Sequence, residues 1–295
     1  MSILSIILIL LVCAVVVVLI ASAECGRRRI PQVDVVDGFI YLAGSLYVRL
    51  THRLKVEIQE DALEDLDGPI IVVCNHTAGV DPILVSSVIP RQVRWLMAED
   101  MRIPWLSWFW KRGGIIFVAR NRSGRSGMRI ARTHLQEEGM IGIFPEGKIG
   151  RPHGNLLPFA PGVGVLVKRT GARVLPVIID GTPDASTAWE SLWTPSHSRV
   201  RVMKPIDYTA LDLGNAEIAK DLEDRFIQWT GWERGQRESR DETSEKDSKN
   251  PSPNNSTNKN SANNIPASNN SANNLANEIA DHFGNGSSEC SRQIA

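Results

Sequence analysis

Cysteine is scarce in this chain, and its few thiols lie far apart. The 295 residues include four cysteines, Cys13, Cys25, Cys74 and Cys290, and no two of them have the spacing of a zinc site. The sequence therefore predicts neither a disulfide framework nor a metal centre. This cysteine usage agrees with a reducing cytoplasm.

Excess charge of one sign and two familiar enzyme motifs are also missing. Lysine and arginine total 33, as do aspartate and glutamate, so no net positive field attracts nucleic acid. No Gly-x-Ser-x-Gly elbow occurs, which argues against a serine lipase of that type. The segment from Gly142 to Lys148 is close to a phosphate-binding loop. However, Ile149 replaces the hydroxyl that would hold Mg²⁺, and Pro145 removes an amide that would face phosphate.

Charged side chains are absent from the first 23 residues, which are mostly Ile, Leu, Val and Ala. A helix of about 20 apolar residues crosses the hydrocarbon core of a bilayer. Ala21-Ser22-Ala23 imitates a signal-peptidase site, but no basic segment precedes the apolar run, and Arg27-Arg28-Arg29 follows it closely. We therefore expect residues 1–23 to be an uncleaved, single-pass anchor in the cell membrane, with the rest of the chain on the cytoplasmic face.

The remaining chain divides into three parts. Residues 24–54 place apolar side chains at helical spacing from Gly38 onward, with basic residues near the end. They predict a juxtamembrane amphipathic helix that either lies in the headgroup layer or packs on its own domain. Residues 55–234 are long enough for one packed domain. Residues 235–295 are charged and then rich in Asn and Ser, which predicts a disordered tail.

Apolar runs alternate with helical patterns through the central part. Strands are expected over residues 55–58, 69–74, 93–97, 115–118, 140–144, 174–179 and 200–202, and helices over 81–88, 126–138 and 162–170. This alternation predicts an α/β fold with a mixed, largely parallel sheet flanked by helices. In such sheets, ligands bind where strands end.

His76 follows the strand expected over residues 69–74, and Asp81 lies five positions after it. A neutral imidazole accepts a proton near pH 7, and a carboxylate bonded to its other nitrogen fixes the tautomer and stabilises the imidazolium. None of the other five histidines has Asp at the fifth following position. The pattern predicts a general base with its orienting carboxylate, and a surface turn that contains both side chains by chance is the alternative.

Polar residues follow two more expected strands. Arg120 ends one of them and is placed to bind phosphate, unless it opens a loop that is merely solvated. Phe144-Pro145-Glu146-Gly147 ends the other in a turn that presents a carboxylate near Lys148 and Arg151, unless this is an ordinary surface charge. The aromatic segment Trp105–Trp110 suits the core, the lining of an acyl tunnel or a membrane interface.

Four blocks of the sequence, taken in their order along the chain, resemble the glycerophospholipid acyltransferases, the family of bacterial 1-acylglycerol-3-phosphate acyltransferases. The blocks are Asn75-His76 with Asp81, Gly114-x-x-Phe117-x-x-Arg120, Phe144-Pro145-Glu146-Gly147 and Val174-x-Pro176-Val177. The resemblance covers residues 54–208, and the first and third blocks are its most specific parts.

The resemblance implies transfer of a fatty acyl group from acyl-CoA or acyl-carrier protein to the hydroxyl of a lysophospholipid at the bilayer. The implied acceptor is 1-acylglycerol-3-phosphate, which becomes phosphatidic acid. His76 would deprotonate the acceptor hydroxyl and Asp81 would orient the imidazole, with neither metal nor cofactor. Arg120 would bind the acceptor phosphate. The other substrate-binding candidates are Asn75, Gly114, Phe144, Pro145, Glu146, Gly147, Lys148, Arg151 and Pro176.

Two of the four blocks depart from the family pattern. The third block commonly continues with Thr-Arg-Ser, where this chain has Lys148-Ile149-Gly150, and the second commonly carries Asp before its Arg, where this chain has Ala119. A phosphate-binding arginine is thus missing, with Lys148 or Arg151 as substitutes, and an acceptor other than lysophosphatidic acid stays open. The alternative functions are an acyl-thioester hydrolase that uses water at the same base and a non-catalytic lipid-binding or scaffold protein of the same fold.

Overall fold

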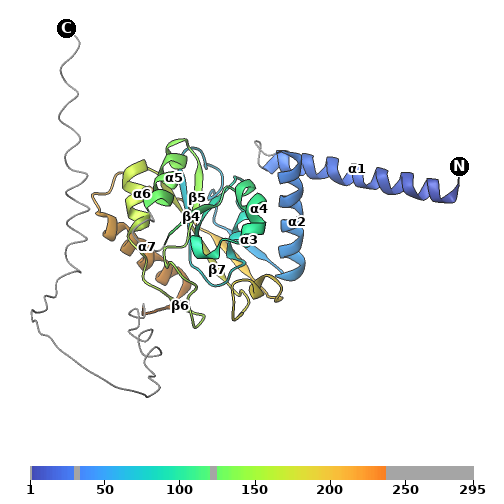
Figure 1. Ribbon diagram of the computed structural model, residues 1–295. Helices are drawn as coiled ribbons and strands as arrows, with labels where there is room; N and C mark the ends of the chain where they lie inside the picture. Colours follow the sequence, from blue (N-terminus) through green and yellow to red (C-terminus); the bar gives the residue numbers. More distant parts are fainter. Residues whose placement is uncertain (1, 30–33, 120–124, 237–295) are drawn as a thin grey trace, which may run out of the picture. The chain divides into compact units, whose positions relative to one another are not determined.

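The computed structural model describes residues 2–29, 34–119 and 125–236. Within them, a seven-stranded sheet has helices packed on both faces (Figure 1). The predicted α/β fold with a mixed, largely parallel sheet is confirmed. The disordered tail expected over residues 235–295 lies outside the described residues, apart from Gly235 and Gln236.

The sheet has the strand order β1-β8-β7-β2-β5-β3-β4. Its strands are β1 (Lys55–Ile58), β2 (Ile70–Cys74), β3 (Arg94–Ala98), β4 (Ile116–Val118), β5 (Met140–Ile143), β7 (Arg173–Asp180) and β8 (Arg199–Val202). Neighbours from β7 to β4 run parallel, whereas β8 pairs antiparallel with β7. All seven predicted strands are present, each end within one residue of its expected position. The carboxyl ends of β2, β5 and β4 therefore meet at one edge of the sheet.

Helices cover the sheet because successive strand residues point to opposite faces. Ile70, Val72 and Cys74 of β2 join the core beneath α2 and α3, whereas Ile71 and Val73 join the core beneath α5, α6 and α7. All five side chains are fully buried, so β2 is a central strand and its carboxyl end is firmly placed. The helices are α2 (Val35–Thr51), α3 (Asp81–Ser86), α4 (Ser107–Arg112), α5 (Arg125–Gln136), α6 (Gly162–Thr170) and α7 (Asn215–Thr230).

Some elements have no counterpart among the sequence predictions. These are α4, α7, the short strands β6 (Asn155–Leu156) and β9 (Glu233–Arg234), and the 3₁₀ turns η1 (Glu99–Met101), η2 (Pro104–Leu106) and η4 (Glu190–Leu192). Helix α7 begins where the amide of Gly214 donates to the Glu217 carboxylate at 2.6 Å. It buries Ile218, Leu222 and Phe226 at a spacing of four.

Two helices precede the domain in sequence. Helix α1 (Ile3–Arg29) contains the span Ile3–Ala21, which has a mean hydropathy of 3.7 and is long and apolar enough to cross a membrane. Helix α2 starts earlier than predicted because the Asp34 side chain accepts a hydrogen bond from the Asp37 amide at 2.9 Å. One face of α2 packs on the domain through Val48, and Tyr41 donates to the Ser87 carbonyl.

Candidate active site

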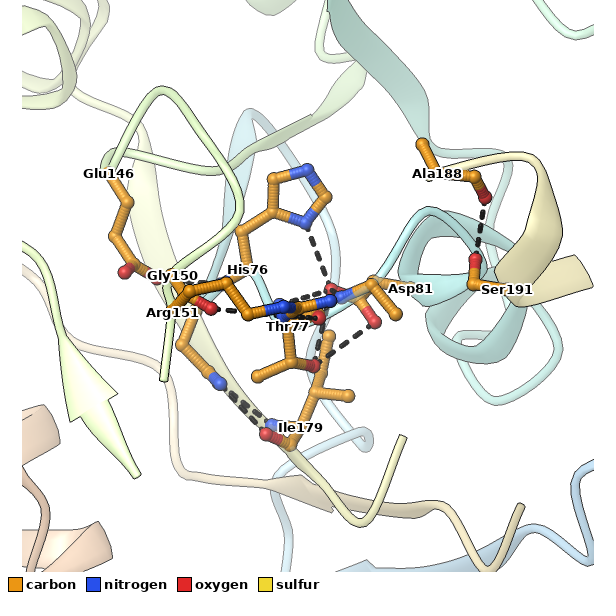
Figure 2. Close-up of polar contacts among 11 residues, drawn as sticks. His76, Thr77, Asp81, Glu146, Gly150, Arg151, Ile179, Ala188 and Ser191 are labelled. Carbon is orange, nitrogen blue, oxygen red and sulfur yellow. Dashed lines mark hydrogen bonds and ion pairs between the residues drawn. The ribbon is translucent and has the colours of Figure 1, made fainter. Parts of the chain in front are cut away.

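The chain leaves β2 at Cys74 and brings His76 onto the carboxylate that begins α3 (Figure 2). His76 Nδ1 lies 2.9 Å from Asp81 Oδ2, which also accepts hydrogen bonds from the amides of Thr77 at 2.7 Å and Ala78 at 2.9 Å. Because these two amides already donate to Oδ2, Nδ1 carries the hydrogen and Nε2 keeps its lone pair. Asp81 is fully buried, whereas 18% of the His76 side chain is exposed. The imidazole therefore presents an acceptor nitrogen toward solvent.

Aromatic rings fix the plane of His76. Phe144, directly after β5, stacks on the imidazole with 4.1 Å between ring centroids, and Trp95 of β3 stacks on Phe144 at 5.0 Å. Trp95 Nε1 donates in turn to Ser86 Oγ at 2.9 Å. Three neighbouring strands thus orient one imidazole.

Glu146 fixes the backbone of His76 through a hydrogen bond. Its side chain is buried, with Oε1 accepting the His76 amide at 2.6 Å and Oε2 accepting the Leu157 amide at 2.9 Å. Burial raises the pKa of Glu146 to about 8, and the nearby Asp81 charge adds to this, although the two amides act in the opposite direction. The His76 carbonyl accepts the Gly150 amide at 2.9 Å, so Glu146 and Gly150 together hold the backbone amide and carbonyl of His76.

Asn75 and Pro176 lie within the framework of the sheet. The buried Asn75 side chain donates to the Ile179 carbonyl at 2.7 Å and accepts the Ile179 amide at 2.8 Å, which extends the pairing of β2 with β7 past Cys74. Pro176 is aligned with Val73 and accepts a bond from the Met203 amide at 3.0 Å. It has no amide hydrogen to return, so the β7–β8 ladder ends there. Pro176 is thus paired with the residue three positions before His76.

Arg151 binds the backbone around the site. One terminal nitrogen donates to the Thr77 carbonyl at 2.7 Å and to the Gly150 carbonyl at 3.0 Å (Figure 2). The other donates to the Ala185 carbonyl at 3.2 Å. Most of its donors are therefore used by the loops beside His76. The turn before it exposes Gly147 and Lys148, whereas the buried Pro145 accepts the Ala160 amide at 2.8 Å.

The structure describes the second block from Gly114 to Ala119 only. Gly114 lies before β4 and His76 after β2, so the two lie at opposite edges of the parallel strands. Gly114 has a φ of +63°, and a Cβ there would lie 2.9 Å from the Arg94 side chain, which fills that space. Arg120, expected on the acceptor phosphate, lies outside the described residues.

Residues 181–193 form part of the site that sequence reasoning missed. A Cβ on Gly79 would lie 2.2 Å from the Ala188 carbonyl oxygen, so this segment packs directly on the turn between His76 and Asp81. The Ser191 hydroxyl donates to that carbonyl at 2.6 Å (Figure 2). Trp189 contacts Trp110, which lies against Phe117. No local pattern encodes this approach, because it joins residues about a hundred positions apart.

Comparisons with known proteins agree with this geometry. Residues 53–180 match the family model described as "Acyltransferase". Over 141 residues, 42% of this chain, the sequence is 30% identical to a Dictyostelium discoideum protein named "Taffazin", and it spans 48% of that relative's length. The fold resembles the crystal structure of the 1-acyl-sn-glycerophosphate (LPA) acyltransferase PlsC from Thermotoga maritima, with a TM-score of 0.53 and 21% identity. That match covers 65% of this chain and 79% of the other.

The matched residues 53–180 contain the first three blocks of the resemblance, from Asn75 through Gly147, and part of the fourth. The same stretch contains the strands β2 and β5 that bring His76 and Glu146 together. The predicted resemblance to acyltransferases is therefore confirmed for residues 53–180, which match the acyltransferase family model.

Proposed function

We propose that this protein transfers a fatty acyl group from acyl-CoA or acyl-carrier protein to the hydroxyl of a lysophospholipid. The observation that carries the proposal is the pair formed by His76 Nδ1 and the buried Asp81 carboxylate, which leaves Nε2 as a base in an acyltransferase domain. The favoured acceptor is 1-acylglycerol-3-phosphate, whose product is phosphatidic acid. Titles of the relatives support a glycerophospholipid substrate but concern those proteins.

In the proposed reaction, His76 Nε2 removes the proton of the acceptor hydroxyl as its oxygen attacks the carbonyl carbon of the thioester. The carbon–sulfur bond then breaks, and the imidazolium returns the proton to the departing sulfur as a thiol. Asp81 stabilises the imidazolium by accepting its Nδ1 hydrogen throughout. The attacking oxygen belongs to the acceptor, so the step needs neither a metal nor an enzyme nucleophile.

The proposed location is the cytoplasmic face of the cell membrane, with α1 as a single-pass anchor. Its support is the apolar span Ile3–Ala21 and the arginines at positions 27–29, a charge asymmetry that favours a cytoplasmic domain. A lysolipid acceptor resides in the same bilayer. Protease treatment of sealed vesicles tests this orientation, since digestion of the domain from the outer face would contradict it.

The decisive experiment is turnover by purified full-length protein with acyl-CoA or acyl-carrier protein and a panel of lysolipids. Thiol release and the mass of the new phospholipid are both measured. His76→Ala should lower the rate by about 10²–10⁴-fold through loss of the base. His153→Ala, at a histidine beside the exposed Asp184, is the matched control and should keep its activity. A His76→Ala rate equal to that of the wild type would refute the mechanism.

A hydrolase that uses water at the same base is the second candidate, favoured by the partial exposure of His76. The same assay separates the two, because hydrolysis releases thiol without a lysolipid. A non-catalytic lipid-binding protein would bind lysolipid equally in wild type and His76→Ala and would release no thiol.

A further inference from the structure

Five large aromatic side chains are exposed on two segments near the site. Trp105, Trp108 and Phe109 lie on η2 and α4, with 80%, 60% and 41% of their surfaces exposed, and Trp189 and Trp193 flank η4 with 39% and 79% exposed. We call these five residues the aromatic band. Rings of this size are ordinarily buried, so exposed ones in a group mark a surface that another apolar phase covers.

The two halves of the band are joined by a buried residue. Trp110 is 7% exposed and lies between them, 5.6 Å from Phe109 and 6.4 Å from Trp189 by ring centroids. Its indole nitrogen donates to the Ile103 carbonyl at 3.1 Å, which fixes α4 against η2. The buried Trp110 therefore fixes the positions of the two segments that hold the exposed rings.

The band is also connected to the chain that leaves the anchor. Arg112 forms ion pairs with Asp34 and Asp37 at the start of α2, and its guanidinium lies 5.6 Å from the centre of the Trp108 ring. Asp34 is five residues after Arg29, the last residue of α1. Five residues of extended chain span at most about 18 Å. The band is thus held within a short reach of the helix that is long enough to cross a membrane.

Helix α2 has exposed apolar side chains of its own. Its exposed large side chains are Val36, Phe39, Leu46 and Leu50, which recur at helical spacing along one stripe. Lys111 stands beside the band and supplies positive charge, whereas the charge of Arg112 is neutralised by Asp34 and Asp37. Indole rings with a neighbouring cation match the region between lipid phosphates and hydrocarbon, where Trp is enriched.

We propose that the aromatic band docks the catalytic domain on the lipid headgroup layer of the bilayer that α1 enters. The proposal rests on the membrane location given above and adds a second contact, made by the domain itself. Ala188, next to Trp189, packs on the turn between His76 and Asp81. Docking of the band therefore brings the imidazole close to the headgroups, where a lysolipid hydroxyl reaches it without leaving the bilayer.

Full-length protein in vesicles that contain lipids brominated near the headgroup tests the contact directly, since bromine quenches nearby indole fluorescence. Trp105→Phe, Trp108→Phe and Trp193→Phe should each remove part of the quenched signal. The control Trp232→Phe lies against the core beneath α5, α6 and α7 and should remove only unquenched signal. Quenching unchanged in all three band variants would overturn the proposal, as would burial of the band between two copies of the chain.

A second arm measures turnover. Trp105→Glu and Trp108→Glu should lower the rate on lysolipid in vesicles by about tenfold or more but leave the rate on a short-chain, monomeric lysolipid unchanged. Equal losses on both substrates would indicate a folding defect and count against docking. The quenching pattern needs no turnover, so an inactive protein that still shows it would refute the proposed function and leave the docking surface standing.

Discussion

The Glu146 carboxylate and the His76 backbone amide are joined by a hydrogen bond of 2.6 Å. This contact links the turn after β5 to the residue that follows β2, and the same carboxylate accepts the Leu157 amide. Both blocks were identified as separate motifs in the sequence. Their contact explains why a carboxylate is needed at position 146: it places the peptide of His76 rather than facing the open side of the imidazole.

Replacement of Glu146 by Gln should change how stability depends on pH. The folded pKa of about 8 exceeds the ordinary value of 4.5, so the folded protein retains a proton that the unfolded chain releases. This contribution is fully present below pH 4.5 and is lost as the pH rises through 8. The free energy of unfolding of the wild type, minus that of Glu146→Gln, should therefore fall over this window.

Urea unfolding of both proteins in the same micelles, from about pH 5 to pH 8.5, measures this difference. A difference that grows with pH would contradict the assignment. Glutamine accepts through one oxygen only, so one of the two amides loses its partner. We expect a loss of about 1–3 kcal/mol of stability at the acidic end.

Asp81→Asn should abolish most catalysis without unfolding the site. With the amides of Thr77 and Ala78 kept on its oxygen, the asparagine still accepts from His76 Nδ1 through that same oxygen but brings no negative charge to the imidazole. The tautomer is kept, but the imidazolium that forms when Nε2 accepts the proton loses its stabilising carboxylate. A fall in kcat of about 10²–10⁴-fold with little change in KM is expected.

Steady-state kinetics checks the Asp81 prediction, with Asp184→Asn as the matched control. Asp184 is 80% exposed and contacts Arg151 and His153 rather than His76. An Asp81→Asn enzyme that keeps a tenth of the wild-type kcat would show that the charge of the carboxylate is not needed to stabilise the imidazolium.

Arg151→Gln should reduce kcat for all acceptors alike. Its guanidinium joins the carbonyls of Thr77, Gly150 and Ala185, so its loss loosens the loops on either side of the imidazole. A residue that bound the acceptor phosphate would instead raise KM for lysophosphatidic acid and leave phosphate-free acceptors unaffected. Comparison of both acceptor types in Arg151→Gln and in the exposed Lys148→Gln distinguishes positioning from phosphate binding.

Much of the sheet was predictable because its strands are short apolar runs with few competing interpretations. A continuous apolar run such as Ile70–Cys74 is typical of a strand that is buried on both faces, and it can be recognised from the sequence alone. The position of His76 after that run, with Asp81 five residues on, suggested a base and its carboxylate, and the resemblance of the four blocks favoured this interpretation over a chance surface turn. Their contact could be expected from the spacing because a single turn joins His76 to Asp81.

The rest of the site depends on contacts between distant parts of the chain. Asn75 forms hydrogen bonds with Ile179, and Glu146 accepts hydrogen bonds from His76 and Leu157. No periodicity in the sequence predicts these contacts. Helix α7 is a different case. Ile218, Leu222 and Phe226 repeat every four residues, so a helical signal was present but diluted by charged neighbours on the other face.

Gly79 gives the last prediction, since it lies where the segment before Trp189 crosses the catalytic turn. A Cβ there would stand 2.2 Å from the backbone oxygen of Ala188, a contact that no rotamer change relieves. Gly79→Ala should therefore shift the segment, lower stability by about 1–3 kcal/mol and reduce kcat.

Gly44→Ala is the matched control, because a Cβ on Gly44 in α2 has no heavy atom of a neighbour within 4 Å. It should keep kcat and gain about 0.5–1 kcal/mol. Thermal unfolding and turnover of the two variants test the crossing, and a Gly79→Ala protein with normal kcat would show that the segment does not hold the catalytic turn in place.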